Sequence, residues 1–382
     1  MKVCAIRNAG ATDSSGTDIY RLISMIHIAL IKGIYILADI DIENKHHLNV
    51  FMIGATGLLG SEASRQLLAR GHEVRSLVLP GLPPTFSLPE GLSLSFGNYL
   101  DLSDDGLVAH FSGADVFVFA AGIDERIEVP APAYDAFVRV NNEPLERLLR
   151  LAKAAGVKRA VICGSYFTYF NRVWPELSLA SRHPYIKSRV EQENMALSFS
   201  SADFAVSVLG IPYVFGTQPG RRPVWTFLVE LVRSMPFATF YAKGGTSALT
   251  ARQIGEALAG AAEGKMTGAI PLGWFDLSWK EMFQLIHGAM GRPRRPFFSV
   301  PKPIFQIGAR ARMKRLAKRG VEGGLDLVSF SEFMYRDALI DRTLGAEPLG
   351  VSDDLLQAAV LASIRQSIEF LDGTVDGIAM RM

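Results

Sequence analysis

The segment from Tyr185 to Arg189 has residue types and a spacing suited to acid/base chemistry. Arg189 follows Tyr185 by four residues, so the two side chains share one face of a helix. Pro184 suits the first turn of that helix and places Tyr185 near its start. A free tyrosine has a pKa of about 10, so proton transfer near neutrality requires a neighbouring positive charge. Arg189 supplies it, whereas Lys187 points to the other side of the helix.

A glycine-rich turn, GATGLLG, lies between an apolar run at 48–53 and an amphipathic segment. Gly54 lets the chain leave a strand sharply, Gly57 lets backbone N–H groups approach a phosphate, and Gly60 lets a helix lie close to the sheet. A pyrophosphate would bind at the positive N-terminus of this helix. A purely steric need for glycine is the alternative, but a second strand at 72–79 falls where a dinucleotide-binding unit requires it.

The GxxGxxG spacing and the Tyr185 segment resemble the extended short-chain dehydrogenases, the NAD-dependent epimerase/dehydratase family, over about residues 48–290. The resemblance implies that Ser165 hydrogen-bonds the substrate oxygen and Tyr185 transfers a proton. The family's lysine, which lowers the tyrosine pKa and holds the nicotinamide ribose, is replaced by Arg189, which cannot relay a proton. Asn141 matches an asparagine that orders a water or backbone near the site; capping of the next helix is the plainer and compatible explanation.

The resemblance implies NAD or NADP as cofactor. It does not decide between them, because Val78, Leu79 and Pro80 stand where an acidic residue or an arginine would select the ribose. The segment Asn98–Tyr99 competes with Asp101–Leu102 for the adenine side. The implied cofactor-binding residues are Gly54, Thr56, Gly57, Leu58, Leu59, Gly60, Asp101, Leu102, Ala120, Ala121, Gly122, Tyr185, Arg189, Pro212 and Val214.

Alternating apolar strands and amphipathic helices predict a parallel, doubly wound α/β sheet of Rossmann-like type, with a smaller C-terminal lid or substrate domain. We expect an extension at 1–47, an NAD(P)-binding domain at 48–215, and a substrate region at 216–382 that is partly interleaved with it. Ser278 and Glu281 form a capping-box signature. The expected strands are 48–53, 72–79, 115–119, 157–164 and 203–209, and the expected helices are 59–70, 143–155 and one starting near Tyr185.

Net charge and cysteine content exclude some classes of function for this chain. A net charge of +2 over 382 residues argues against nucleic acid as a partner. Two distant cysteines suggest neither a disulfide framework nor a metal site, so we expect no metal and a reducing, cytoplasmic location. The expected partner is a small-molecule substrate, oxidised or epimerised at a hydroxyl or carbonyl carbon, and the resemblance allows a homodimer. The alternative is a catalytically weak or inactive NAD(P)-sensing regulator, favoured by the replacement of lysine with Arg189.

Three further segments have open roles. Residues 1–47, with an apolar stretch at Ile23–Ile40, are expected to be poorly ordered, the alternatives being a membrane-surface or partner helix. The basic segment 304–319 is expected to be a solvated helix face. Attachment to an anionic membrane or substrate is the minor alternative, so a membrane is not an expected partner. Substrate recognition is expected from the turn at 221–223 and from aromatic residues that equally suit core packing: Tyr166, Phe167, Tyr169, Phe170 and Trp174.

Overall fold

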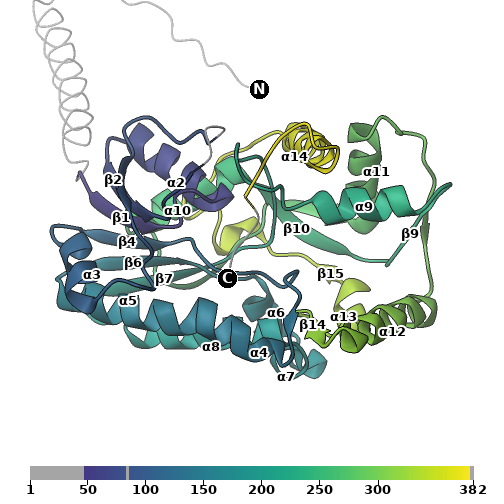
Figure 1. Cartoon of the computed structure of the whole chain (residues 1–382), viewed down its shortest axis with the longest axis horizontal. Helices are drawn as coiled ribbons and strands as arrows, with labels where there is room; N and C mark the ends of the chain where they lie inside the picture. The colour runs from purple at the N-terminus through teal and green to yellow at the C-terminus, as the bar shows by residue number, and fades with distance from the viewer. Residues whose placement is uncertain (1–46, 83–85, 379–382) are drawn as a thin grey trace, which may run out of the picture. The chain divides into compact units, whose positions relative to one another are not determined.

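A seven-stranded parallel sheet forms the centre of the computed structural model, which describes residues 47–82 and 86–378 (Figure 1). Its strand order is β11-β7-β6-β4-β1-β2-β3. From β1 the chain adds β2 and β3 on one side and then returns to add β4 on the other side. The direction of the connections therefore reverses between β1 and β4, which makes this a topological switch point. The strands are β1 (Asn49–Ile53), β2 (Glu73–Val78), β3 (Ser93–Phe96), β4 (Val116–Phe119), β6 (Arg159–Cys163), β7 (Ala205–Gly210) and β11 (Gly268–Pro271).

Helices cover both faces of this sheet. Alternate residues of β1 enter different cores: Val50 and Met52 face one layer, and Phe51 and Ile53 face the other. Burial on both faces explains why the strands are continuous apolar runs. Figure 1 shows α2 and α10 on one side of the sheet and α5 and α8 on the other. These helices are α2 (Leu58–Ala69), α3 (Asp104–Phe111), α5 (Glu143–Ala154), α8 (Pro184–Ser198) and α10 (Ala251–Ala262).

The remaining elements build a second layer around a sheet in which β10 pairs with β8, β12 and β15. Two short strand pairs, β13 with β9 and β14 with β5, flank it. The strands are β5 (Val129–Pro130), β8 (Tyr213–Phe215), β9 (Thr239–Tyr241), β10 (Gly245–Thr250), β12 (Phe275–Ser278), β13 (Phe297–Ser299), β14 (Val321–Glu322) and β15 (Asp337–Ala338). The helices are α4 (Ala133–Phe137), α6 (Phe167–Val173), α7 (Leu179–Arg182), α9 (Thr226–Ser234), α11 (Trp279–Ala289), α12 (Lys302–Lys318), α13 (Leu327–Met334) and α14 (Leu356–Leu371).

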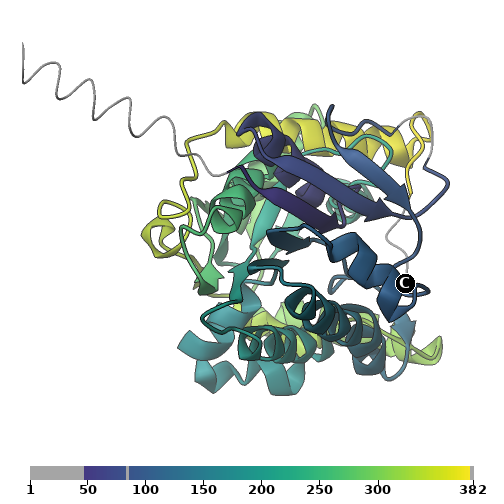
Figure 2. The ribbon, with the colours of Figure 1, turned by 90° about the vertical axis from the view of Figure 1, so that its left-hand side faces the viewer.

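The predicted Rossmann-like class is confirmed, and each expected strand and helix is present with its ends shifted by two residues or fewer. The capping box at Ser278 is also confirmed: its hydroxyl accepts from the Glu281 N–H, and the Glu281 carboxylate accepts from the Ser278 N–H. The expectation that residues 1–47 are poorly ordered concerns residues that, except for His47, lie outside the described part of the chain. Figure 2 shows the central sheet enclosed between its helical layers in the perpendicular view.

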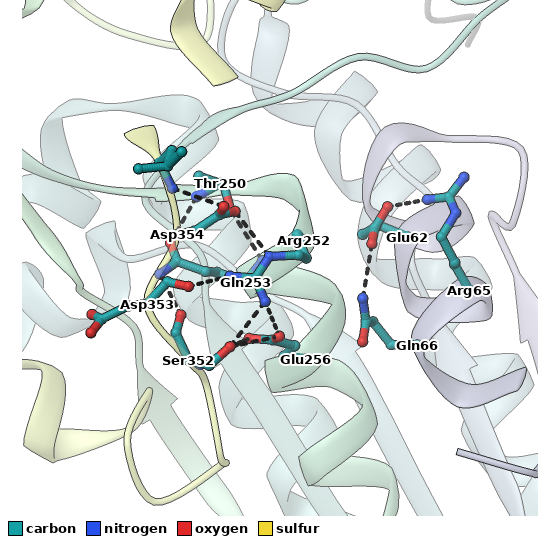
Figure 3. Close-up of polar contacts among 11 residues, drawn as sticks. Glu62, Arg65, Gln66, Thr250, Arg252, Gln253, Glu256, Ser352, Asp353 and Asp354 are labelled. Carbon is teal, nitrogen blue, oxygen red and sulfur yellow. Dashed lines mark hydrogen bonds and ion pairs between the residues drawn. The ribbon is translucent and has the colours of Figure 1, made fainter. Parts of the chain in front are cut away.

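Late parts of the chain return to the first layer. Strand β11 extends the central sheet and α10 packs on α2, where a Cβ at Gly255 would lie 2.8 Å from the Glu62 carbonyl oxygen. Figure 3 shows how β10 and α10 hold residues 352–354. The Thr250 hydroxyl donates to Asp354 at 2.5 Å, and Glu256 accepts from the Ser352 N–H at 2.9 Å. Residues before and after 216 therefore share one sheet and one core.

Two buried histidines predict acid sensitivity. Burial lowers the pKa of both His183 and His287 to about 4. Their pKa is higher in the unfolded chain, so stability is present above about pH 6.5 and is lost as the pH falls towards 4. Denaturant titrations should give the wild type a steeper loss between pH 7 and 4 than the His183→Asn/His287→Gln variant, by roughly 3 kcal/mol per histidine. Parallel pH profiles for the two proteins would contradict this.

Candidate active site

The glycine turn between β1 and α2 has a geometry that only glycine permits at two positions. Gly54 has a φ of +104°, and a Cβ there would lie 2.5 Å from the Ala120 carbonyl oxygen at the end of β4. A Cβ at Gly60 would lie 2.2 Å from the Gly54 carbonyl oxygen. The turn closes through the Gly57 N–H, which donates to Gly54 at 2.9 Å. The N–H groups of Leu58 and Leu59 lie in the first turn of α2, where backbone donors have no acceptor within the helix and can bind an anion.

Arg221 adds a positive charge to this turn. Its Nε donates to the Thr56 carbonyl oxygen at 3.0 Å, and its Nη2 donates to the Thr56 hydroxyl at 2.5 Å. The sequence analysis expects the turn at 221–223 to contact substrate; in the structure, Arg221 lies beside the glycine turn between β1 and α2. A guanidinium at this position complements a pyrophosphate, because it offers several charged donors in one plane.

We expect Arg221→Ala to weaken NAD(P) binding by about tenfold, because the variant loses one charged partner for the pyrophosphate. Arg222→Ala is the matched control, since Arg222 is exposed and its guanidinium lies 5.5 Å from the Phe370 ring, away from the turn. Isothermal titration calorimetry compares the two. Equal dissociation constants for both variants would remove Arg221 from the nucleotide site.

Ser165, Tyr185 and Arg189 come together at the carboxyl end of β6. Ser165 follows that strand, and Tyr185 and Arg189 occupy successive turns of α8. All three are buried, with exposed fractions of 4%, 6% and 6%. Ser165 hydrogen-bonds the Tyr185 side chain, and the Arg189 guanidinium lies 5.8 Å from the centre of the Tyr185 ring. Lys187 is outside this group, because its ammonium lies 3.9 Å over the Tyr134 ring.

The protonation state of Tyr185 differs from the expectation. Burial raises its pKa to about 12, and the opposing effects of Arg189 and Ser165 are smaller than this desolvation. The phenol is therefore protonated at neutral pH, and Arg189 alone does not bring the phenolate into the neutral range. Without another base in the site, the Tyr185 hydroxyl is in the form that can donate a proton and not in the form that can accept one.

One N–H donor of the Arg189 guanidinium, at Nε, has no hydrogen-bond partner among the described residues. Its Nη2 donates to the Cys163 carbonyl oxygen at the end of β6. Its Nε is buried and has no hydrogen-bond partner among the described residues. A buried, charged donor without an acceptor is costly, so this atom fits a ligand oxygen such as a ribose hydroxyl. Together with the phosphate donors at α2, it makes the residues present suitable for a dinucleotide.

Glu125 is the site residue that the sequence analysis missed. It lies in the loop after β4, and Gly324 joins it to Tyr185: the Gly324 N–H donates to the Glu125 carbonyl oxygen at 3.1 Å, and the Gly324 carbonyl oxygen accepts from the Tyr185 N–H at 3.0 Å. A Cβ at Gly324 would lie 2.8 Å from both Glu125 Cα and Tyr185 Cβ. Burial, followed by the neighbouring Asp124, raises the pKa of Glu125 to about 7.

Asn141 positions the loop that carries Glu125. It is fully buried; its Oδ1 accepts from the Ile123 N–H at 2.8 Å, and its Nδ2 donates to the Ile123 carbonyl oxygen at 2.9 Å. It makes no capping bond to α5, whose N-cap residue is Asn142, so the capping explanation is wrong. Gly122, with a φ of +137°, leaves room for this contact because a Cβ there would lie 2.7 Å from Asn141 Oδ1.

The structure separates some expected cofactor residues from the turn. Asn98 and Tyr99 directly follow β3 and Gly97, whereas Asp101 is exposed and accepts from the Asn98 side chain at 2.9 Å. This placement favours Asn98–Tyr99 over Asp101–Leu102 for the adenine side. The Val214 carbonyl oxygen accepts from the Trp225 indole at 2.9 Å, and its strand pairs with β10. These contacts give Val214 a structural role, and cofactor binding by this residue stays a prediction.

The aromatic run after Ser165 packs into the second layer. Tyr166, Phe167 and Phe170 are buried, and Phe333 of α13 contacts each of their rings at centroid distances of 6.0, 5.2 and 5.3 Å. Trp174 stacks on the same cluster through Phe170 at 4.5 Å. The core-packing alternative is therefore the one that the structure supports for these residues.

The fold and this site define a dinucleotide-binding protein of the Rossmann class. Residues 54–205 match the model of the NAD(P)H-binding family, and no curated protein sequence matches the chain. Sequence similarity alone therefore identifies the nucleotide-binding domain and no particular protein.

Solved structures share this fold across most of the chain. The enzyme WbmH of Bordetella bronchiseptica, in complex with NAD+, has a TM-score of 0.60 at 18% identity, covering 85% of this chain and 100% of that one. MoeE5, in complex with UDP-glucose and NAD, has 0.56 at 20%, covering 85% and 99%. The UDP-N-acetylglucosamine 4-epimerase of Methanobrevibacter ruminantium has 0.59 at 13%, covering 85% and 99%. The resemblance to the NAD-dependent epimerases is thus confirmed in the fold.

The described residues do not include a helix long and apolar enough to cross a membrane.

Proposed function

We propose that the chain is an NAD(P)-dependent enzyme that oxidises, reduces or epimerises a hydroxyl-bearing carbon of a nucleotide-linked sugar. The observation that carries the proposal is the placement of the glycine turn at Gly54 and of the Ser165, Tyr185 and Arg189 cluster at the same edge of the sheet, at the carboxyl ends of β1 and β6, which are separated by β4 alone. The substrate class is supported by the solved structures with the same fold, which include complexes with UDP-glucose and with UDP-N-acetylmuramic acid.

Each residue has a distinct role in this proposal. When bound, NAD(P) supplies a nicotinamide carbon that accepts or returns a hydride. Ser165 holds the substrate oxygen, and Arg189 binds the ribose through its unpartnered Nε. The Tyr185 phenol lies beside that oxygen and transfers its proton. Arg189 cannot replace the family's lysine as a proton carrier, because a guanidinium does not deprotonate in this range.

Glu125 provides the base that this arrangement otherwise lacks. Its carboxyl changes charge near pH 7, whereas Tyr185 remains protonated far above neutrality. During oxidation, the proton that leaves the substrate hydroxyl is taken up by the Tyr185 and Glu125 pair; during reduction it returns. Asn141 keeps Glu125 in place by binding both backbone polar groups of Ile123.

The test of the proposed function is isotope transfer. Full-length protein is incubated with NAD or NADP and a panel of UDP- and dTDP-sugars deuterated at single ring carbons, and mass spectrometry follows the label. We expect label to leave one ring carbon for the nicotinamide, or to return to that carbon with inverted configuration. Calorimetric binding of NAD(P) without label movement on any sugar would favour the regulatory alternative.

We expect Glu125→Gln to lower kcat about 10- to 100-fold and to remove the inflection near pH 7 from its pH profile. Because folding raises the Glu125 pKa from 4.5 to about 7, the wild type loses stability as the pH rises through this interval and loses no more above it. The same variant should therefore be more resistant to denaturant than wild type at pH 8 and not at pH 5. Glu128→Gln, three residues along in the same segment, is the control and should change neither profile. An unchanged inflection in Glu125→Gln would exclude Glu125 from proton transfer.

A further inference from the structure

Positive charge is concentrated in one stretch of the chain. Residues 282–321 contain ten Lys and Arg residues and no Asp or Glu. Since the whole chain carries a net charge of +2, the remaining residues carry −8. Such segregation creates a local positive field that the overall charge hides.

Helix α12 presents this charge on a face that the rest of the described structure leaves exposed. Phe305 and Ala309 face inward, and Phe305 meets the Tyr241 ring of β9 at 6.2 Å. The opposite face begins with Ile304 and Ile307 and continues, at intervals of three or four residues, to Lys314, Arg315 and Lys318. The exposed face of the helix is therefore apolar in its first two turns and cationic in its last two.

Most of these cations lack a counter-charge within the described residues. Arg312 and Arg319 pair with Glu128 at 3.4 and 3.1 Å, and Lys302 pairs with Glu332 at 2.7 Å. On α12 itself, the cations that make no ion pair in the described part of the chain are Arg310, Lys314, Arg315 and Lys318. Four neighbouring unpaired cations on one helix attract an anionic surface.

Large apolar side chains are also exposed on and beside the strands that adjoin α12. Phe240 of β9 and Phe298 of β13 stack on each other at 5.6 Å, and both are more than half exposed. Strand β9 adjoins α12 through Tyr241, whose carbonyl oxygen accepts from the Val300 N–H at 2.9 Å, and Figure 1 shows both elements at the same end of the molecule. Phe237, just before β9, is 87% exposed. Exposed apolar groups of this size, close together, mark an interaction surface.

We propose that this surface docks on an anionic lipid bilayer. It comprises Phe237, Phe240, Phe298, Ile304, Ile307, Arg310, Lys314, Arg315 and Lys318, and is called the docking face below. Five apolar side chains that are 51% to 87% exposed can enter the boundary between headgroups and acyl chains while the cations bind lipid phosphates. Aliphatic Ile304 and Ile307 match the acyl-chain boundary and the cations match the headgroups, so a bilayer accepts both parts of the surface. The binding is peripheral and independent of the proposed reaction.

Vesicle sedimentation of the full-length chain tests the proposal. Wild type should sediment with phosphatidylcholine vesicles that contain about 30% phosphatidylglycerol, an amount that gives a strong negative surface charge. It should remain in solution with pure phosphatidylcholine vesicles or at high salt. The variant Lys314→Glu/Arg315→Glu/Lys318→Glu should bind at least about 100-fold more weakly. Ile304→Ser/Ile307→Ser should bind about tenfold more weakly, because it keeps the charge and loses insertion.

The matched control is Arg139→Glu/Lys158→Glu/Arg365→Glu, which makes the same change in charge at exposed positions outside the docking face and should bind as wild type does. Circular dichroism establishes that each variant is folded. Three results would overturn the proposal. The first is no binding of wild type to anionic vesicles at low salt, and the second is unchanged binding of the Lys314 triple variant, which would place the contact elsewhere in the chain. The third is unchanged binding of the isoleucine variant together with tighter binding of wild type to an oligonucleotide than to vesicles.

Discussion

Replacing Tyr185 with phenylalanine should lower kcat by about a thousandfold while leaving the dissociation constant of NAD(P) within about threefold of wild type. The substitution removes only the hydroxyl that Ser165 contacts, and the ring keeps its packing against Phe137 at 5.4 Å. The phenol is the group that reaches the substrate oxygen in the proposed arrangement. Steady-state kinetics on the sugar identified by isotope transfer, with calorimetry for the nucleotide, measures both quantities.

Tyr134→Phe is the matched control for this prediction. The Tyr134 hydroxyl donates to Glu191 at 2.5 Å, outside the cluster at β6, so its loss should leave kcat unchanged. If Tyr185→Phe kept more than a tenth of the wild-type rate, Tyr185 would not be the proton donor. A loss of NAD(P) binding in that variant would instead assign the tyrosine to cofactor binding.

Gly60→Ala should destabilise the protein by about 3 kcal/mol and abolish measurable NAD(P) binding. Its Cβ would lie 2.2 Å from the Gly54 carbonyl oxygen, and a backbone atom cannot move aside as a flexible side chain does. Relief requires α2 to shift away from β1, which also displaces the N–H groups that face the phosphate. Denaturant titration gives the change in free energy of unfolding, and calorimetry gives nucleotide affinity.

Gly288→Ala serves as the comparison. Gly288 lies in α11, and nothing lies within 4 Å of a Cβ placed there. This variant should be neutral or more stable by about 0.5 kcal/mol, since alanine favours a helix over glycine. Equal stabilities of the two variants would mean that the contact between Gly60 and Gly54 does not constrain the fold.

The parts of the site that the sequence predicted are set by local spacing. Gly54, Gly57 and Gly60 fall within one strand-turn-helix unit, and Tyr185 and Arg189 lie on one helix, so periodicity alone relates them. The central sheet was predictable for the same reason, because each buried strand is a short apolar run bounded by helices. The π-helical segment Val138–Asn142, which contains Asn141, directly precedes the expected helix at 143–155.

The parts that were not predictable depend on contacts between distant residues. Glu125 reaches Tyr185 because Gly324, about two hundred positions later, fits between their backbones. Arg221 reaches Thr56 across 165 positions. The pKa of Tyr185 could not be obtained from spacing either: Arg189 was visible in the sequence, but the degree of burial that outweighs its charge depends on the packed structure.

The same limit applies to the docking face. The basic segment was visible in the sequence, and most basic helices are solvated. Its combination with exposed Phe240 and Phe298 arises only when β9 and β13 pair and lie next to α12.

The central claim is that a dinucleotide lies across the carboxyl ends of β1, β4 and β6 with its nicotinamide beside Tyr185. A crystal structure of the chain with NAD or NADP tests it most directly. The account predicts pyrophosphate oxygens on the N–H groups of Leu58 and Leu59, a ribose hydroxyl on Arg189 Nε, and the nicotinamide within contact distance of the Tyr185 hydroxyl. A dinucleotide bound away from the Gly54 turn, or one whose nicotinamide faces away from Tyr185, would contradict it.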